Sequence, residues 1–335
     1  MQSFWAAYFI LTGMKKLFFL LFLIPIFFFS QKKEVLRYFI SEDSLVGVKN
    51  QKGEIIIPAE FRIYSSTSLK NGEKIKENII YIEGRKINEA DEKNASGYMY
   101  DRKGNFLYQP FIYDNGADYF VEGVRRFVKN GKVGFADQNG KIVIEAKHDF
   151  VSSFNYGYAA FCNGCDWEKI DDEHSRMAGG IWGVMNYKGE IAQPVSNPSE
   201  KDVEVDGKYY PYVFQYNQKE KEILQFFEKY EPLLFDLHAL PFVDVFLEKE
   251  KKLFFEIIER PKENFPYYRI NTYNWEKRNL DNELGFLVSE DRKKIYKMNY
   301  DEEKEPFNKW LKEDIRIMLK YQEEHPDHPN KLEIK

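Results

Sequence analysis

NGKVGFADQNGKIVIEAKHDF, residues 130–150, is the stretch that decides which fold this chain predicts. Residues 133–137 are a short apolar run, and the Asn139-Gly140 pair that follows is typical of a tight turn. Residues 141–145 then alternate apolar and polar side chains, as a half-buried strand does. The stretch therefore predicts a β-hairpin.

Three other segments repeat this hairpin pattern. They are residues 45–61 (LVGVKNQKGEIIIPAEF), 97–113 (GYMYDRKGNFLYQPFIY) and 179–194 (GGIWGVMNYKGEIAQP). The shared positions are a turn glycine (Gly53, Gly104, Gly140, Gly189), a residue six before it (Gly47, Tyr98, Gly134, Gly183), an Asn or Asp three before it (Asn50, Asp101, Asp137, Asn186) and a later proline (Pro58, Pro110, Pro194), where the third copy has Glu145. The turn glycines are 51, 36 and 49 residues apart, which indicates a period of about 36 residues with insertions in the first and third gaps.

Each shared position has a physical reason. The turn glycine can adopt the positive φ that tight hairpins require, and the Asn or Asp can accept backbone hydrogen bonds that start the turn. A mid-strand glycine such as Gly183 lets another backbone or an aromatic ring approach closely, and we expect Trp182 to supply such a ring. The proline should close the second strand because it cannot donate to a ladder.

This pattern resembles the WG-repeat family of bacterial proteins, whose core is a Trp-Gly pair followed by Asn or Asp, a turn glycine and a strand ending in proline. The match is close at residues 182–194 and partial in the other copies, where Val46, Gly97 and Val133 stand at the Trp position. Residues 154–159, and more loosely 119–124, resemble the linking strand between units. The resemblance covers residues 35–198, and it implies an interaction module without family-wide catalytic residues.

The N-terminus carries a predicted signal peptide. Residues 14–30 place Lys15 and Lys16 before a short apolar run that ends at Ser30. We expect Met14 to be the natural start and residues 1–13 to be an upstream over-extension. The chain would then be exported to the periplasm or outside a Gram-negative cell, with membrane contact only through this segment if it stays uncleaved.

The remainder of the chain predicts two insertions and a second domain. Residues 70–95 read as a long hairpin insertion and residues 162–178 as a second insertion with an acidic run, and residues 31–200 together form the predicted repeat domain. From residue 201 to 335 the pattern predicts a helix opened by a capping box at Asn217 and stopped by Pro232, several antiparallel strands, and a last helix from Pro306 that ends before Pro326. This order is α+β and faintly resembles the cystatin-like and nuclear-transport-factor-like folds.

The charge and aromatic composition limit the classes of partner that the protein is expected to bind. Residues 1–200 carry 25 basic and 25 acidic side chains, so the net charge of −5 comes from residues 201–335. Because no basic stripe is present, we expect no nucleic-acid partner. Aromatic side chains make up 17% of the chain and favour a packed β-rich structure.

The two cysteines, Cys162 and Cys165, are compatible with a disulfide, a redox motif or a metal site. Export favours a structural disulfide or two unreactive thiols, and the intervening Asn163-Gly164 predicts a hairpin turn rather than the helix start of a redox motif. His148 and His174 stand at no recognised zinc spacing, and the acidic residues 171–173 form no calcium loop. We therefore expect no metal, cofactor or catalytic residue.

The sequence thus predicts a β-rich array of stacked hairpins, either a closed propeller or an open solenoid, followed by an α+β domain. The favoured function is non-enzymatic binding of a protein or cell-envelope partner. Two alternatives stay open. One is an immunity or anti-toxin partner, and the other is an enzyme with its site in the C-terminal domain. A flat aromatic surface on the repeats would favour binding, and a deep polar pocket with facing carboxylates in residues 201–335 would favour an enzyme.

Overall fold

The computed structural model describes residues 34–64, 69–113, 116–171, 174–199, 201–241, 251–262, 265–274, 280–298 and 304–332, without the side chains of residues 280–283. The predicted signal peptide and its upstream extension lie outside these residues. In the described ranges the chain is rich in antiparallel β-structure and contains two helices. Neither helix is long and apolar enough to cross a membrane.

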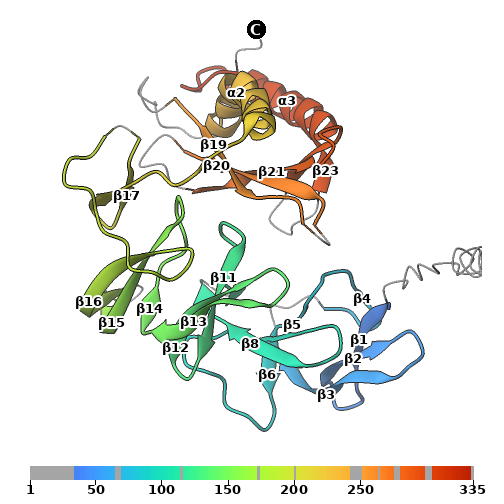
Figure 1. The fold of residues 1–335 in the computed structure, drawn as a ribbon. Coiled ribbons are helices and arrows are strands. Elements are labelled where there is room, and N and C mark those ends of the chain that lie inside the picture. Colours follow the sequence, from blue (N-terminus) through green and yellow to red (C-terminus); the bar gives the residue numbers. More distant parts are fainter. Residues whose placement is uncertain are drawn as a thin grey trace, which may run out of the picture.

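The repeats build three sheets in the lower half of Figure 1. The first sheet, in the order β4-β1-β2-β3-β6, consists of β1 (Leu36–Ile40), β2 (Val46–Asn50), β3 (Ile55–Ile63), β4 (Lys74–Ile75) and β6 (Gly84–Lys86). The second, β13-β12-β11-β8-β7-β5, consists of β5 (Ile80–Ile82), β7 (Tyr98–Tyr100), β8 (Phe106–Pro110), β11 (Val124–Lys129), β12 (Lys132–Asp137) and β13 (Ile142–His148). The third is β14 (Phe150–Val151), β15 (Tyr158–Lys169) and β16 (Ser175–Asn186), and a small ribbon is β9 (Ile112–Tyr113) with β10 (Gly116–Ala117).

The repeating unit is larger than the predicted hairpin. A further antiparallel strand precedes the first three hairpins, so that β1-β2-β3, β5-β7-β8 and β11-β12-β13 are three-stranded meanders. In the fourth copy β15 takes this place beside β16. The second and third units join edge to edge through β8 and β11, where Phe127 pairs with Pro110. Among the described strands, no sheet closes on itself.

The four hairpin turns share one hydrogen-bond pattern. In the third copy, the Asp137 carboxylate accepts the backbone N–H of Asn139 (2.9 Å) and of Lys141 (3.0 Å), and the Gly140 N–H donates to the Asp137 carbonyl (2.9 Å). Asn50, Asp101 and Asn186 make the corresponding bonds in the other copies. The turn glycines have φ between 73° and 86°, a range in which a residue with a side chain has a strained backbone.

The mid-strand glycines have close neighbours of two kinds. A Cβ on Gly134 would lie 2.5 Å from the carbonyl oxygen of Ile144, because the partner strand bulges over it. A Cβ on Gly47 would meet both a bulged partner strand, at the Ile57 carbonyl oxygen, and the Phe39 ring, each at 2.7 Å. A Cβ on Gly183 would lie 2.6 Å from the Phe161 ring. The expectation that Trp182 supplies this ring is therefore wrong, since the neighbouring side chain on a strand points to the other face.

The prolines close the second strand in only one copy. Pro110 is the last residue of β8, as predicted. Pro58 instead lies inside β3, in the bulge between the pairs Val48–Ile57 and Val46–Phe61, where a missing N–H disturbs no ladder bond. Pro194 lies in a loop beyond the isolated bridge at Ile191.

Both insertions differ from the prediction. Residues 70–95 are not a hairpin, because β4 pairs with β1, β6 with β3 and β5 with β7, so the segment adds edge strands to two sheets. In the other insertion, Asn163-Gly164 makes no turn. It lies within the long strand β15, where Asn163 pairs with Ile181 of β16. The extended ladder on both sides holds Gly164 in the strand despite its φ of 78°.

Residues 218–332 place two helices against a five-stranded sheet, above the repeats in Figure 1. The elements are α2 (Gln218–Ala239), β19 (Phe254–Glu259), β20 (Tyr267–Tyr273), β21 (Leu280–Ser289), β22 (Ile295–Met298), β23 (Lys304–Pro306) and α3 (Phe307–Glu324). The predicted capping box at Asn217 and Glu220 is confirmed, but α2 continues through Pro232. Leu234, Phe235 and Leu237 are buried beyond the proline, and this burial outweighs the lost helix bond.

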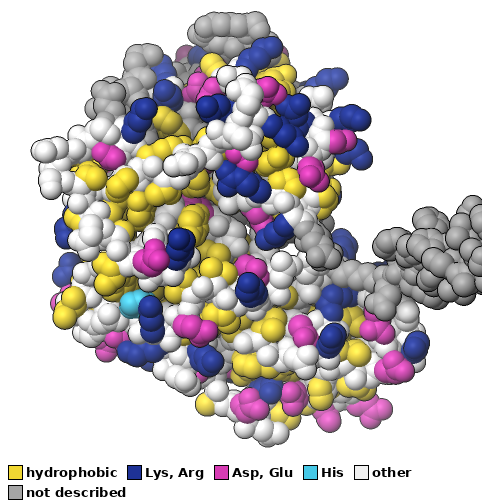
Figure 2. Space-filling model, viewed as in Figure 1, with side chains coloured by type: hydrophobic (Ala, Val, Ile, Leu, Met, Phe, Trp, Pro, Cys, Tyr) yellow, Lys and Arg dark blue, Asp and Glu magenta, His cyan; other side chains and the backbone are white. Residues whose placement is uncertain are grey.

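A tyrosine-rich junction joins the repeats to the C-terminal part. Its core contains Tyr156 and Tyr158 of the repeats, Tyr210 of the hairpin β17 (Val203–Val205) and β18 (Lys208–Tyr210), and Tyr273 of β20. Figure 2 shows hydrophobic side chains gathered over this hairpin and the neighbouring repeats. The ring centroids of Tyr156 and Tyr273 are 4.1 Å apart.

One buried carboxylate organises the junction. Glu122 accepts the backbone N–H of Tyr156 (2.7 Å) and of Gly157 (2.9 Å), and the hydroxyls of Tyr187 and Tyr273 also donate to it. Burial raises the pKa of the Glu122 carboxyl, against the lowering effect of these four hydrogen bonds. Glu92 binds a tight turn at another place in the repeats, accepting the N–H of Asn130 and Gly131 between β11 and β12, but at the surface.

Candidate binding surface

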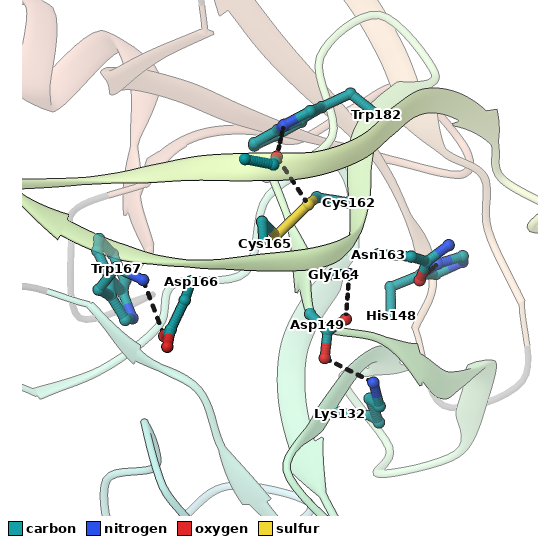
Figure 3. Close-up of a disulfide and its surroundings, with 11 residues drawn as sticks. Lys132, His148, Asp149, Cys162, Asn163, Gly164, Cys165, Asp166, Trp167 and Trp182 are labelled. Atoms are coloured by element: carbon teal, nitrogen blue, oxygen red, sulfur yellow. Dashed lines mark hydrogen bonds and ion pairs between the residues drawn. A yellow bond between two sulfur atoms is a disulfide. The ribbon is translucent and has the colours of Figure 1, made fainter.

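The long hairpin of β15 and β16 carries the largest exposed aromatic side chains of the described repeats. Phe150 of β14 pairs with Cys162, and Cys162 pairs with Trp182, so these three residues form a row across the sheet. Because directly paired residues share a face, the rings of Phe150 and Trp182 lie on one side, with centroids 6.1 Å apart. Trp182 also donates from its indole N–H to the Gly179 carbonyl oxygen at 2.8 Å, which fixes the ring (Figure 3).

Trp167 joins the same side because the hairpin is kinked. With regular alternation, Trp167 would lie on the face opposite Trp182, five residues along the strand from Cys162. Its ring nevertheless lies 6.3 Å from the Phe150 ring. Between the two tryptophan levels, Gly164 and Gly180 have φ of 78° and 70°, which breaks the pleat on both strands.

The disulfide between Cys162 and Cys165 spans this kink. A Cβ on Gly180 would lie 2.6 Å from the Asn163 carbonyl oxygen and 2.8 Å from the Cys162 sulfur, so the bridge occupies the space a side chain would need. The disulfide therefore links two residues of β15 on either side of Gly164, next to Gly180 of the paired strand and close to Trp182 (Figure 3). Of the three alternatives for the cysteines, the structure shows the disulfide.

Two tyrosines extend the aromatic surface toward the second unit. Phe150 contacts Phe111, whose ring is covered by the Arg126 guanidinium at 4.7 Å. The same guanidinium lies 5.7 Å from the Tyr113 ring, and Tyr113 contacts Tyr119 at 6.0 Å. We define the aromatic strip as Tyr113, Tyr119, Phe150, Trp167 and Trp182. All but the half-buried Phe150 have between 38% and 53% of their surface exposed.

Arg126 is held rigidly under the strip. Its guanidinium is nearly fully buried and donates from Nε and Nη2 to the Asp118 carboxylate, each at 2.8 Å. A third bond runs to the Val151 carbonyl oxygen at 3.2 Å. Because both charges are paired and hydrogen-bonded, the arginine can support Phe111 and Tyr113 as a fixed platform.

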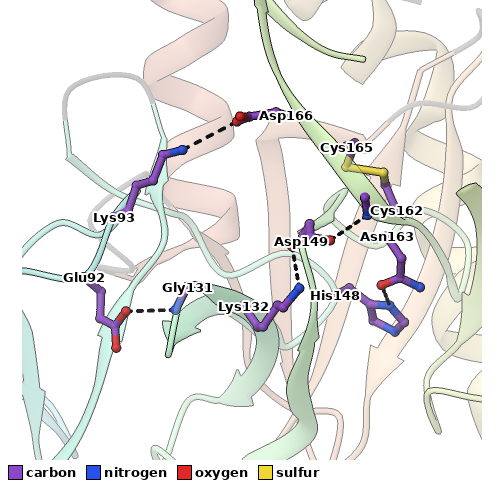
Figure 4. Close-up of polar contacts among 11 residues, drawn as sticks. Glu92, Lys93, Gly131, Lys132, His148, Asp149, Cys162, Asn163, Cys165 and Asp166 are labelled. Atoms are coloured by element: carbon purple, nitrogen blue, oxygen red, sulfur yellow. Dashed lines mark hydrogen bonds and ion pairs between the residues drawn. A yellow bond between two sulfur atoms is a disulfide. The ribbon is translucent and has the colours of Figure 1, made fainter. Parts of the chain in front are cut away.

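Charged side chains pair with one another near the disulfide (Figure 4). Lys93 lies 3.5 Å from Asp166, and Lys132 lies 2.5 Å from Asp149, which also accepts the Gly164 N–H at 2.7 Å. The hydrogen bond from Lys132 lowers the pKa of the Asp149 carboxyl. Asp149 and Asp166 directly precede Phe150 and Trp167 of the strip in the sequence, and the bonds of Asp149 attach the part of β15 around the disulfide to Lys132 of the third unit.

The histidines that could have joined a metal site have other contacts. His148 places Nδ1 3.0 Å from the Asn163 side-chain oxygen and stacks on Phe161, and burial lowers its pKa. His174 lies beside Asp171, 2.9 Å from its carboxylate, while residues 172–173 of the acidic run lie outside the described residues. No group of three His, Cys, Asp or Glu side chains suited to a metal gathers within the described ranges.

Of the sequence-predicted positions, only Trp182 belongs to the strip, and the cysteine pair lies next to it with Cys162 buried. The repeat glycines and prolines lie in turns, strands and loops instead. Sequence analysis missed Phe150, Trp167, Tyr113 and Tyr119 as surface partners of Trp182. Their common signal was large aromatic side chains near strand ends, which core packing explains equally well.

Comparison with known families gives one match. Residues 99–132 and 134–164 each match the family model described as WG containing repeat. The two matched segments start within the second and third units and include Phe150. Neither the curated proteins nor the solved structures gave a match to this chain.

Proposed function

We propose that this WG-repeat protein is an exported, non-enzymatic binding protein whose aromatic strip contacts a protein or cell-envelope component. The observation that carries the proposal is the strip itself, two groups of exposed aromatic side chains that the buried Phe111 and Arg126 connect, since exposed aromatic clusters are typical of interaction sites. Tryptophan and tyrosine present large, rigid contact areas at low entropic cost, and they dominate binding energy in many interfaces.

The proposed architecture follows from the edge-to-edge contact of the units. We propose that the hairpin units stack as an open array rather than as a closed propeller, and that residues 201–335 form a separate α+β domain. The pairing of β8 with β11 supports side-by-side growth, in which each unit buries its face against its neighbours. Localisation outside the cytoplasm rests on residues 14–30 alone.

The immunity-partner alternative would use a different surface. It rests on the acidic excess of residues 201–335 and would place the contact on the C-terminal part. Removing the aromatic strip would then leave binding unchanged, so one experiment separates the two functions.

The experiment measures binding of the chain from residue 31 onward to two immobilised preparations from a Gram-negative host, peptidoglycan sacculi and detergent-solubilised envelope proteins. Biolayer interferometry compares the native chain with a Trp167→Ala, Trp182→Ala double variant. We expect the variant to bind more than about tenfold more weakly to one preparation, because truncation of central aromatic residues costs at least about 2 kcal/mol.

The matched control is Ile317→Ala, which removes an exposed apolar side chain on α3, far from the strip in sequence. It should bind as the native chain does. Equal binding by the double variant and the native chain would reject the strip as the binding surface.

A further inference from the structure

The C-terminal part contains a cavity that the binding function of the repeats does not use. It lies between the first turns of α2 and the turn joining β21 to β22, and its volume is ≈ 380 Å³. Its apolar wall is formed by five side chains, Ile223, Phe226, Phe227, Val288 and Ile295. A pocket of this size with an apolar wall and a few polar groups at its rim suits a small molecule.

An ion pair crosses the mouth of this cavity. The Arg292 guanidinium donates to the Glu222 carboxylate of α2, 70 residues earlier in the chain. Arg292 has φ of 62°, a strained value for a residue other than glycine, and Ser289 and Asp291 hold its turn with side-chain bonds to backbone N–H groups. The turn thus maintains a fixed polar rim on an apolar cavity.

The rim has one carboxylate oxygen with spare capacity. Oδ1 of Asp291 accepts the Ser289 hydroxyl (2.6 Å) and the Lys293 N–H (3.1 Å), whereas Oδ2 makes, among the described residues, a single long ion pair with the largely exposed Lys293 Nζ at 4.0 Å. The Ser289 hydrogen bond lowers the pKa of the Asp291 carboxyl, so it is ionised at neutral pH. The three charged groups lining the mouth, Glu222, Asp291 and Arg292, together carry a net charge of −1, and the side chain of Lys293 extends into solvent outside the lining.

We propose that this cavity binds a small amphiphilic amine. The apolar body of the ligand occupies the cavity between α2 and β22, and its ammonium group donates to Asp291 Oδ2 at the rim. A carboxylate head would meet the net negative rim, and a neutral head would forgo the charge-assisted bond. This site is independent of the aromatic strip, so either proposal can fail alone.

Isothermal titration calorimetry of the full mature chain at pH 7 tests the proposal with three eight-carbon probes below their aggregation limits: octylammonium, octanol and octanoate. We expect octylammonium to bind at one site per chain. Octanol should bind up to about fivefold more weakly than octylammonium, because an exposed ion pair contributes up to about 1 kcal/mol, and octanoate should bind more weakly than octanol. Octanoate binding as tightly as octylammonium would overturn the assignment of the charge.

Variants locate the site. Asp291→Asn keeps the turn acceptor but should reduce octylammonium affinity to that of octanol. Ile295→Trp should fill the cavity and abolish binding, while the same change at the exposed Ile317 should have no effect. Unchanged binding by folded Ile295→Trp or by Asp291→Asn would refute the site, as would tighter binding of an acetylated Leu-Lys dipeptide amide, which would indicate a protein partner instead.

Discussion

Replacing Glu122 by alanine should destabilise the protein far more than the same change at Glu92. Both carboxylates accept two backbone N–H groups of a tight turn, but Glu122 does so in the buried junction and Glu92 at the surface. At Glu92, water can replace the lost acceptor, so the change should cost within about 1 kcal/mol. At Glu122, the two buried amides each lose their partner at about 1–3 kcal/mol, and the hydroxyls of Tyr187 and Tyr273, which unlike the amides can rotate, lose the same acceptor.

The expected cost of Glu122→Ala is therefore about 2–4 kcal/mol, since removing a buried charge offsets part of the loss at the amides. Urea unfolding followed by tryptophan fluorescence measures the free energy of unfolding of the native chain and of both variants. Equal effects at Glu122 and Glu92 would refute the reasoning, because burial would then not decide the cost.

The pH dependence gives an independent check on Glu122. Its pKa in the folded protein is raised above the ordinary value of 4.5, so the folded state binds this proton more readily than the unfolded state. The pH-dependent part of the stability that Glu122 contributes is thus fully present below pH 4.5 and falls as pH rises through the folded-state pKa. The difference between native chain and Glu122→Ala should accordingly grow on acidification. A difference that shrinks would contradict the direction of the shift.

Three further predictions concern the turn, the cysteines and export. Gly189→Val should lower the free energy of unfolding by about 1–2 kcal/mol, because Gly189 has φ of 73°, whereas Lys188→Val should be milder; equal losses in thermal melts would disprove the turn assignment. Changing Cys162 and Cys165 to serine should leave the fold intact and lower the free energy of unfolding by about 2 kcal/mol, because a disulfide that closes so short a loop restricts the unfolded chain only slightly. Stoichiometric zinc in the native protein that is lost in this variant would contradict a purely structural role. Expression from Met14 in a Gram-negative host should give an exported chain that lacks the signal peptide. If N-terminal sequencing finds cytoplasmic protein that still begins at Met14, the export prediction is wrong.

The turns could be predicted from sequence because their chemistry is local. Asp137 and Gly140 lie three residues apart, and their turn requires only a short polar acceptor and a residue tolerant of positive φ. The capping box of α2 is equally local. These features depend on neighbours within one turn, which a single sequence displays directly.

The rest depends on distant partners. Asn163-Gly164 has the composition of a turn, but the ladder with residues 179–181 keeps it in a strand. Pro232 has the composition of a helix stop, but buried side chains on both sides of it continue the helix. The sequence around Glu122 does not show that this carboxylate is buried, because one of its partners, Tyr273, is 151 residues away. In each case tertiary packing outweighs local preference, and the sequence alone does not reveal the packing.

The Glu122 junction also determines how the molecule can come apart. Linear repeat arrays tend to fray from their ends, because a terminal unit has only one neighbour, and they need a cap to protect it. Here the last hairpin, through Tyr187, and the C-terminal sheet, through Tyr273, share one acceptor with the turn at Tyr156 and Gly157. Opening either element exposes the same buried carboxylate. The C-terminal sheet thus acts as the cap of the array, and this end should unfold as one cooperative unit with it.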